Sequence, residues 1–227
     1  MRKIALIVAG GNGSRMNSDI PKQFLLLNNK PVLYYSIKAF LDAYEDMEVI
    51  LVLPAEHIGK GQEIIDGYFD NSKFKITAGG RTRFHSVKNG LSLIEKEDAI
   101  IFVHDGVRCL LTINLIKECY QAALALGTAV PAVSCMDSVR MVTNAGNKIL
   151  DRKKIKLVQT PQTFHSKILI PAFAIDYKDK FTDEATVVEA FGLKVNLIEG
   201  ENNNIKITTP LDLIMAECIQ NAKPDNI

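Results

Sequence analysis

The sequence has no long apolar segment and almost no excess charge of either sign. Its 227 residues include 27 Lys and Arg against 26 Asp and Glu, which gives a formal net charge of +1. A nucleic-acid-binding protein usually carries a clear basic excess, and the net charge of +1 shows none. No stretch approaches the roughly 20 apolar residues of a membrane-spanning helix. These absences argue against nucleic-acid and membrane partners, whereas a small anionic ligand would need only a few local cations.

Cysteine is sparse and is not spaced for metal binding. None of the four cysteines stands in C-x-x-C spacing, which argues against a zinc knuckle. We therefore expect reduced thiols in a cytoplasmic protein. The N-terminal apolar run of about seven residues is too short for the apolar region of a signal peptide, which agrees with a cytoplasmic location. The cysteines are Cys109, Cys119, Cys135 and Cys218.

Short apolar runs alternate with helix-length segments along most of the chain. Continuous rather than alternating hydrophobicity favours strands that helices cover on both faces. The runs predict strands at residues 4–9, 48–53, 73–77, 100–104 and 128–133. The segments between them predict helices at residues 32–43, 86–93 and 115–126. This order indicates an α/β fold with a doubly wound, mostly parallel sheet, in one domain that spans residues 1–227.

The alternation of strands and helices breaks after about Ser134. Residues 137–151 contain two short stretches around Asn144-Ala-Gly-Asn147, the pattern of a β-hairpin. Such a hairpin cannot bury its apolar residues alone, so it packs either on a partner subunit or on its own sheet, and the spacing favours neither. Further short strands are expected at 194–198 and 205–208. Thr209-Pro-Leu-Asp212 then has the pattern of a helix start with a capping box.

A glycine cluster at residues 10–13 follows the first predicted strand. Backbone N–H groups in such a loop can approach an anion closely, and ligands of α/β sheets bind beyond the carboxyl ends of the strands. The loop matches neither the Walker A pattern nor the dinucleotide fingerprint, because Met16 stands where the latter needs glycine or alanine. Arg15 and Lys22 would neutralise several phosphate charges, which indicates a triphosphate. Glycines that serve only a tight turn are the alternative.

Several segments, in order and over nearly the whole chain, resemble one family. The first is Ala9-Gly-Gly-Asn-Gly-Ser-Arg-Met16 with Pro21-Lys-Gln23. Together the segments resemble the cytidylyltransferases of the 2-C-methyl-D-erythritol 4-phosphate pathway of isoprenoid synthesis, within the sugar-phosphate nucleotidylyltransferases. The others are Gly79-Gly-Arg-Thr-Arg83-Phe-His-Ser86-Val, His104-Asp-Gly-Val-Arg108, Asp137-Ser138, Asp151-Arg152, Gln159-Thr-Pro-Gln162, Thr182-Asp-Glu-Ala185 and Asn204-Ile-Lys-Ile-Thr208.

The resemblance implies a Rossmann-like fold and the transfer of CMP from CTP to methylerythritol phosphate, with Mg²⁺ or another divalent cation on CTP. It also implies a homodimer, in which a hairpin arm of about residues 137–152 reaches the site of the neighbouring subunit. The implied catalytic residues are Arg15, Lys22, Arg152 and Lys206. The implied nucleotide-binding residues are Ala9, Gly10, Gly11, Gly80, Ser86 and Asp105. The implied residues for the second substrate are Asp105, Arg108, Ser138, Arg152, Thr160, Thr182 and Lys206.

Taken singly, these residues have more ordinary interpretations. Asp105 ends a strongly apolar run, where a carboxylate either serves as a metal ligand with Mg²⁺ or caps a helix. Arg152 and Lys206, without the resemblance, would be solvated surface charges. His104 is predicted to be a hydrogen-bonded core histidine rather than a ligand. Two hydroxyl residues would ordinarily belong to turns or caps: Ser138 and Thr182.

Other functions remain as alternatives to the methylerythritol phosphate enzyme. Ribitol-5-phosphate cytidylyltransferases share most of the same segments and act on a similar acyclic polyol phosphate. Asp151-Arg152 upstream of Gln159-Thr-Pro-Gln162 favours the isoprenoid enzymes. A non-catalytic nucleotide-binding protein would be a different class, although the chain keeps all the implied charged residues. A dehydrogenase is disfavoured by the missing dinucleotide fingerprint.

Overall fold

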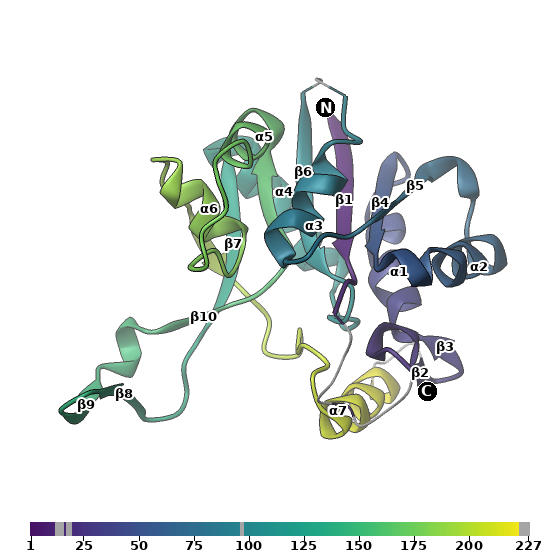
Figure 1. The fold of residues 1–227 in the computed structure, drawn as a ribbon. Helices are drawn as coiled ribbons and strands as arrows, with labels where there is room; N and C mark the ends of the chain where they lie inside the picture. The colour runs from purple at the N-terminus through teal and green to yellow at the C-terminus, as the bar shows by residue number, and fades with distance from the viewer. Residues whose placement is uncertain (12–15, 17–19, 96–97, 223–227) are drawn as a thin grey trace.

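The computed structural model describes residues 1–11, 16, 20–95 and 98–222. Within them, a central sheet runs in the order β10-β7-β11-β6-β1-β4-β5, and β12 also pairs with β7 (Figure 1). Helices lie against both faces of this sheet (Figure 1). The strands are β1 (Arg2–Val8), β4 (Met47–Leu53), β5 (Phe74–Ala78), β6 (Ala99–Asp105), β7 (Thr128–Ser134), β10 (Lys156–Val158), β11 (Gln162–His165) and β12 (Leu197–Glu199).

The sheet is mostly parallel, as the sequence predicts. Strands β6, β1, β4 and β5 pair in parallel, so their carboxyl ends meet at one edge of the sheet. Strand β11 pairs antiparallel with both β6 and β7, and β10 pairs antiparallel with β7. The five strands predicted before residue 134 are all present, with ends that differ by a residue or two from the expected bounds.

Two hydrophobic layers explain why the central strands are apolar without interruption. Successive side chains of a strand point to opposite faces, so Ala5 and Ile7 of β1 lie in one core and Ile4 and Leu6 in the other. The first core packs under α1 (Val32–Ala43), α2 (Ile58–Tyr68) and α4 (Ile113–Leu126). The second packs under α3 (Arg83–Leu91), α5 (Ser166–Ala172) and α6 (Glu184–Ala190).

The C-terminal helix α7 (Pro210–Asn221) begins as predicted. The backbone N–H of Thr209 donates to Asp212 Oδ2 at 2.7 Å, which is one half of a capping box, and Pro210 is the first helical residue. The helix packs near the short strands β2 (Leu26–Leu27) and β3 (Lys30–Pro31). No helix among the described residues is long and apolar enough to cross a membrane.

The strand predicted at 205–208 is wrong. Residues 203–208 are irregular, and the backbone of Ile207 donates one hydrogen bond to the carbonyl of Val107 at 3.0 Å rather than joining a ladder. The apolar residues of this segment have another role. Ile207 is fully buried in a third small core with Leu27, Val32 and Ala216 of neighbouring elements. The strand expected at 194–198 is shorter and lies later, as β12.

The predicted hairpin forms and stands apart from the central sheet. Strands β8 (Val139–Thr143) and β9 (Gly146–Leu150) pair with each other in a sheet of their own. Figure 1 shows this hairpin arm, residues 137–152, projecting away from the body of the molecule. Apolar side chains on it are exposed, with Val142 at 83% and Ile149 at 68%. Of the two packing alternatives, the hairpin therefore does not fold back on its own sheet.

Candidate active site

A cavity of about 270 Å³ lies at the carboxyl ends of β1 and β6. The sequence predicts ligands at this edge of the sheet. Eight of the implied site residues line it, although they come from five separate stretches of the chain: Ala9, Gly10, Gly11, Lys22, Gly80, Ser86, Asp105 and Lys206. Arg15, the other implied cation of the first loop, lies outside the described residues.

The first loop leaves β1 with its backbone held and its glycines open. Ala9 donates its N–H to the carbonyl of Val52 at 2.9 Å, and Gln23 Nε2 donates to the carbonyl of Ala9 at 2.8 Å. A Cβ built on Gly11 would meet no atom of the described residues within 4 Å. Those residues therefore leave the backbone of Gly11 uncovered beside the cavity, which is the access that a phosphate would need.

The opposite wall is the start of helix α3. Ser86 Oγ accepts a hydrogen bond from the N–H of Gly80 at 3.0 Å and donates to the carbonyl of Thr82 at 3.0 Å. This hydroxyl thereby closes the turn that leads from β5 into the helix. A Cβ on Gly80 would lie 2.4 Å from the Cβ of His85, so the tight turn requires glycine at this position.

Asp105, at the end of β6, is surrounded by three cations. Its Oδ1 is bound by Arg83 Nη1, and its Oδ2 lies 2.8 Å from Lys206 Nζ and 3.6 Å from Arg108 Nε. Burial raises the pKa of the Asp105 carboxyl, but Arg83, Lys206 and Arg108 lower it by more, so the pKa falls below its usual value. Asp105 is therefore an ionised carboxylate. It does not cap a helix, because Thr112 is the N-cap of α4.

The two implied catalytic lysines are brought together by one short segment. Lys22 is largely buried, and its Nζ donates to the carbonyl of Ile207 at 3.0 Å. Lys206 precedes Ile207 and has a side chain that is 43% exposed. Lys206 is thus paired with Asp105 and reachable from the cavity, rather than being a solvated surface charge.

His104 and Thr160 lie beneath Asp105. His104 Nε2 lies 3.2 Å from the carbonyl of Arg108, an acceptor, so Nε2 carries the proton and Nδ1 accepts from Thr160 Oγ1 at 3.1 Å. Burial lowers the pKa of His104 to about 3. The prediction of a hydrogen-bonded core histidine is therefore confirmed. Thr160 Oγ1 also accepts from the N–H of Asp105 at 3.1 Å, so its hydroxyl supports the carboxylate from behind.

Two other residues expected at the second substrate lie at the border of the site. Arg108 Nη1 donates to the carbonyl of Asn204 at 2.7 Å, which ties the turn after β6 to the segment that leads to Lys206. Burial lowers the pKa of the Arg108 guanidinium. Thr182 is exposed and immediately precedes Asp183, the N-cap of α6.

Ser138 and Arg152 are not part of the cavity of this chain. Both border a separate depression on the hairpin arm, together with Ile149, Leu150 and Asp151. Arg152 Nη1 donates to the carbonyl of Met136 at the base of the arm. One chain alone therefore does not bring these two residues to Asp105.

Sequence reasoning missed two residues at the centre of the site. Arg83 joins Asp105 to Glu184, whose Oε2 lies 2.9 Å from Arg83 Nη2. Glu184 is buried, with a side chain that is 1% exposed. Both residues stand inside segments that carry the family resemblance, but only the fold shows that α3 and α6 bring them to the end of β6. The opposite charges of Arg83 and Glu184, in two segments that carry the resemblance, were the only sequence feature that pointed to this pair.

Metal-binding capacity rests on a single carboxylate. Among the described residues, no group of three or more His, Cys, Asp or Glu could hold a metal ion. Asp105 is the only carboxylate in the described lining of the cavity. Mg²⁺ is commonly held by one or two carboxylates together with substrate phosphates and water. The residues fit an ion that arrives on a triphosphate, and they do not fit an ion held by the protein alone.

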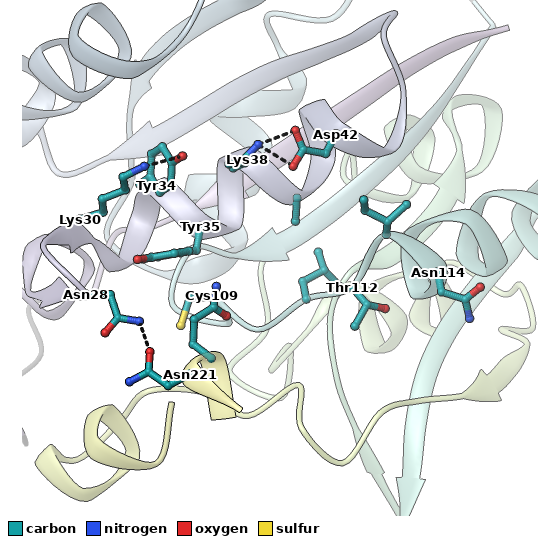
Figure 2. A pocket seen from close by; sticks show the side chains of 14 residues that line it. Asn28, Lys30, Tyr34, Tyr35, Lys38, Asp42, Cys109, Thr112, Asn114 and Asn221 are labelled. Atoms are coloured by element: carbon teal, nitrogen blue, oxygen red, sulfur yellow. Dashed lines mark hydrogen bonds and ion pairs between the residues drawn. The ribbon is translucent and has the colours of Figure 1, made fainter. Parts of the chain in front are cut away.

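A second, larger cavity of about 890 Å³ lies between α1, residues 109–114 and the end of α7 (Figure 2). Its polar groups are engaged with one another. Lys38 pairs with Asp42 at 2.7 Å, and Lys30 donates to the hydroxyl of Tyr34 at 3.0 Å (Figure 2). None of the implied site residues lines it, so size alone does not identify the active site.

Comparison with known proteins agrees with this geometry. The family model described as 2-C-methyl-D-erythritol 4-phosphate cytidylyltransferase matches residues 3–222. The protein of that name from Phocaeicola vulgatus is 43% identical over 219 residues, which cover 96% of this chain and all of the relative. The crystal structure of the Francisella tularensis 2-C-methyl-D-erythritol 4-phosphate cytidylyltransferase aligns with a TM-score of 0.79 at 31% identity, over 96% of this chain and 99% of that one.

A second solved structure extends the match to a more distant relative. The 4-diphosphocytidyl-2C-methyl-D-erythritol synthase from Anaerococcus prevotii aligns with a TM-score of 0.83 at 25% identity, over 97% of this chain and 96% of that one. The family match spans the sheet, the helices and the segments that build the cavity. The chain therefore belongs to the 2-C-methyl-D-erythritol 4-phosphate cytidylyltransferase family.

Proposed function

We propose that the cavity at the ends of β1 and β6 transfers CMP from CTP to 2-C-methyl-D-erythritol 4-phosphate, giving 4-diphosphocytidyl-2-C-methyl-D-erythritol and pyrophosphate. The observation that carries this proposal is the set of cations around Asp105. Lys206 and Arg108 approach one carboxylate beside an open glycine loop, and Lys22 lies against the same segment as Lys206. The names of the nearly full-length relatives supply the nucleotide and the acceptor.

The reaction needs two polyanions to be held together. A phosphate oxygen of the acceptor attacks the α-phosphorus of CTP, and the bond from that phosphorus to the bridging oxygen of pyrophosphate breaks in line. The second pKa of a phosphate monoester is about 6, so the attacking oxygen is already ionised at neutral pH and needs no general base. Catalysis then depends on positioning and on neutralising the negative charge.

The described residues divide between these tasks. The backbone from Ala9 to Gly11 would hold the triphosphate, and Gly80 with Ser86 would hold the nucleoside end. Lys22 would stabilise the negative charge on the phosphates during transfer, together with Arg15. Lys206 would serve the second substrate or the α-phosphate; its side chain pairs with Asp105 and is 43% exposed.

A divalent cation would enter with CTP. Mg²⁺ would neutralise part of the charge on the phosphates, and Asp105 would be its protein ligand. Both Asp105 oxygens already contact cations, through Arg83 and Lys206. A carboxylate has about four lone-pair positions, so it can keep both contacts and still bind an ion.

The acceptor half of the site would be completed by a second copy of the chain. Ser138 and Arg152 lie on the exposed hairpin arm, away from the cavity of their own chain. The arm and the segment that follows it, residues 137–156, carry six cations against two carboxylates. Such a basic arm suits delivery to a site that binds phosphates. In a homodimer, the arm of one subunit would place Ser138 and Arg152 over the partner's acceptor phosphate.

The acceptor is tested by a side-by-side assay at equal CTP. Pyrophosphate release is measured with methylerythritol phosphate and with ribitol 5-phosphate. We expect kcat/KM to be about tenfold or more higher for methylerythritol phosphate, the size of discrimination that a few acceptor contacts can supply. Faster turnover with ribitol 5-phosphate would assign the alternative acceptor. CTP binding without release from either acceptor would indicate a non-catalytic nucleotide-binding protein.

A further inference from the structure

We propose that Arg83, held in place by Glu184, is a positioning residue that orients the Asp105 carboxylate and, through it, Lys206. The proposal rests on the cytidylyltransferase activity proposed above. Neither Arg83 nor Glu184 needs to contact a reacting atom for this role. They act by fixing the groups that do.

The geometry shows a guanidinium shared between two carboxylates. Arg83 Nη1 binds Asp105 Oδ1, and Arg83 Nη2 binds Glu184 Oε2 at 2.9 Å. The carboxylates are buried, with exposed fractions of 8% and 1%. Because Arg83 occupies Oδ1, the other oxygen of Asp105 is turned toward Lys206, 2.8 Å away. The plane of the Asp105 carboxylate is therefore set by Arg83.

Glu184 stands on a firmly held element. It is the first residue of α6, and the residues on either side of it are tied to Gln162 of β11. Gln162 Nε2 donates to Asp183 Oδ2 at 3.0 Å, and Gln162 Oε1 accepts from the N–H of Ala185 at 2.8 Å. Strand β11 pairs directly with β6, which ends at Asp105. The carboxylates of Asp105 and Glu184, together with Arg83 between them, form an arginine clamp. Both carboxylates are thus anchored to adjacent strands of one sheet.

Arg83 and Glu184 are better explained by a role in positioning Asp105 than by a role in stabilising the fold. Buried charge networks carry a desolvation cost, and replacing them by apolar residues is often neutral or stabilising. Arg83 and Asp105 line the cavity, whereas Glu184 pairs with Arg83 from beside Phe84 and Val187 of the second core. Arginine is also required by the geometry, because its planar fork can hold two carboxylates in fixed directions and a lysine cannot. Catalytic groups need this kind of rigid support to keep a productive geometry.

The network also explains how the site stays cationic. Arg83 carries a single positive charge, which offsets part of the negative charge of the two carboxylates, so its charge is used within the protein. Arg108 and Lys206 then share an Asp105 carboxylate that is already balanced in part. Their positive charge remains available to an incoming polyanion. Removing Arg83 would turn Asp105 toward Lys206 and Arg108 alone, and would draw their charge away from the phosphates.

The test uses Arg83→Met, Arg83→Lys, Glu184→Gln and the double variant Arg83→Met/Glu184→Gln. Pyrophosphate release is measured with CTP and methylerythritol phosphate. We expect Arg83→Met to lower kcat on the order of 10- to 100-fold, as loss of a supporting contact typically does, with a smaller change in KM for CTP. Arg83→Lys restores little, because it lacks the fork. Glu184→Gln lowers kcat less than Arg83→Met does.

The double variant separates positioning from general damage. Without Arg83, Glu184 has nothing to hold, so the second substitution adds no further loss in kcat and raises Tm above that of Arg83→Met. The matched control is Arg2→Met, which breaks a similar bidentate ion pair with Glu48 at the other end of β1. This control lowers Tm and leaves kcat unchanged.

The outcomes are distinguishable from failure of the proposed function. An inactive wild-type protein would overturn the cytidylyltransferase proposal itself. An active wild type whose Arg83 and Glu184 variants lose Tm but keep kcat would overturn the positioning role and leave the activity intact. If Arg83→Met does not fold, Arg83→Lys and Glu184→Gln decide the question. Full kcat in both of these variants contradicts the proposal, and a loss of kcat in both supports it.

Discussion

Lys22 ends on the backbone of the segment that carries Lys206: its Nζ donates a hydrogen bond to the carbonyl oxygen of Ile207 at 3.0 Å. A residue from the first loop and a residue from the C-terminal part of the chain are therefore fixed relative to each other. The same segment is held from the other side by Arg108, through the carbonyl of Asn204. The charge around the cavity thus depends on contacts between distant parts of the sequence.

Lys22→Ala should abolish most of the turnover. We expect kcat at saturating CTP to fall on the order of 10²-fold or more, because a preorganised group that stabilises the transition state is removed. Steady-state pyrophosphate release measures the effect. Lys38→Ala is the matched control, since Lys38 is half-exposed and paired with Asp42 beside the second cavity. Equal kcat in Lys22→Ala and wild type would remove Lys22 from the catalytic residues.

Gly11→Ala should weaken CTP binding without destabilising the fold. An added Cβ meets none of the described residues within 4 Å, so Tm should stay within a degree or two of wild type. The same Cβ would occupy the space through which the backbone approaches phosphate, and we expect KM for CTP to rise about tenfold. Gly10→Ala tests the neighbouring position of the loop, where the added Cβ would make only an ordinary contact with Ser86 Oγ at 3.7 Å. Identical KM values in all three proteins would show that the loop does not hold the nucleotide.

The free energy of unfolding should decrease as the pH is lowered, because of His104. Burial lowers the folded-state pKa of His104 to about 3, from its ordinary value of 6.5. Between these values the unfolded chain binds a proton that the folded chain does not, so the free energy of unfolding decreases as pH falls. The slope from His104 is at most about 1.4 kcal/mol per pH unit. Urea unfolding between pH 7.5 and 5 measures it.

The variant His104→Gln isolates the contribution of His104. Asp105, with a lowered folded pKa, also lowers the free energy of unfolding as the pH falls, at a lower pH than His104. Glu184, with a raised folded pKa, raises the free energy of unfolding as the pH falls. These carboxyls remain in the variant, so the difference between the two slopes belongs to His104. Equal slopes in wild type and variant would mean that folding does not lower the pKa of His104.

The shared active site is tested with mixed subunits. Arg152→Ala and Lys22→Ala chains should each be nearly inactive alone. If the arm crosses to the partner, a mixed dimer contains one site with both substitutions and one with neither, so mixing should restore activity to part of the wild-type level. Co-expression with two different tags and purification of the heterodimer gives the measurement. Absence of any recovery in the purified heterodimer would show that each site is built from one chain.

Much of the fold could be predicted from local patterns, because the central strands are buried on both faces. Strand β1 is apolar throughout for this reason, and α1 has the predicted bounds since its apolar stripe faces one core. The strand expected at 205–208 does not form, because an apolar residue next to a polar one can have a cause other than a strand. Ile207 is buried beneath α7, and Lys206 turns to Asp105, without any ladder.

The site could be predicted only in part. Gly11 and Lys22 stand in a local pattern that predicts phosphate binding, whereas the role of Asp105 at the substrate was implied only by the family resemblance. The arginine clamp is different. Its meaning depends on α3 and α6 meeting at the end of β6, which in turn depends on β11 lying between β6 and β7. Strand β11 has four residues and no strong pattern, so its position could not be inferred.

That position of β11 has a consequence for synthesis on the ribosome. Strands β6 and β7 are made before β11, yet in the finished sheet β11 separates them. While the chain is growing from its N-terminus, the β6 edge has unpaired backbone groups that can attract the wrong strand. The hairpin arm is made in the same interval, between β7 and β10. Correct assembly therefore requires that β6 and β7 not pair with each other before β11 has emerged.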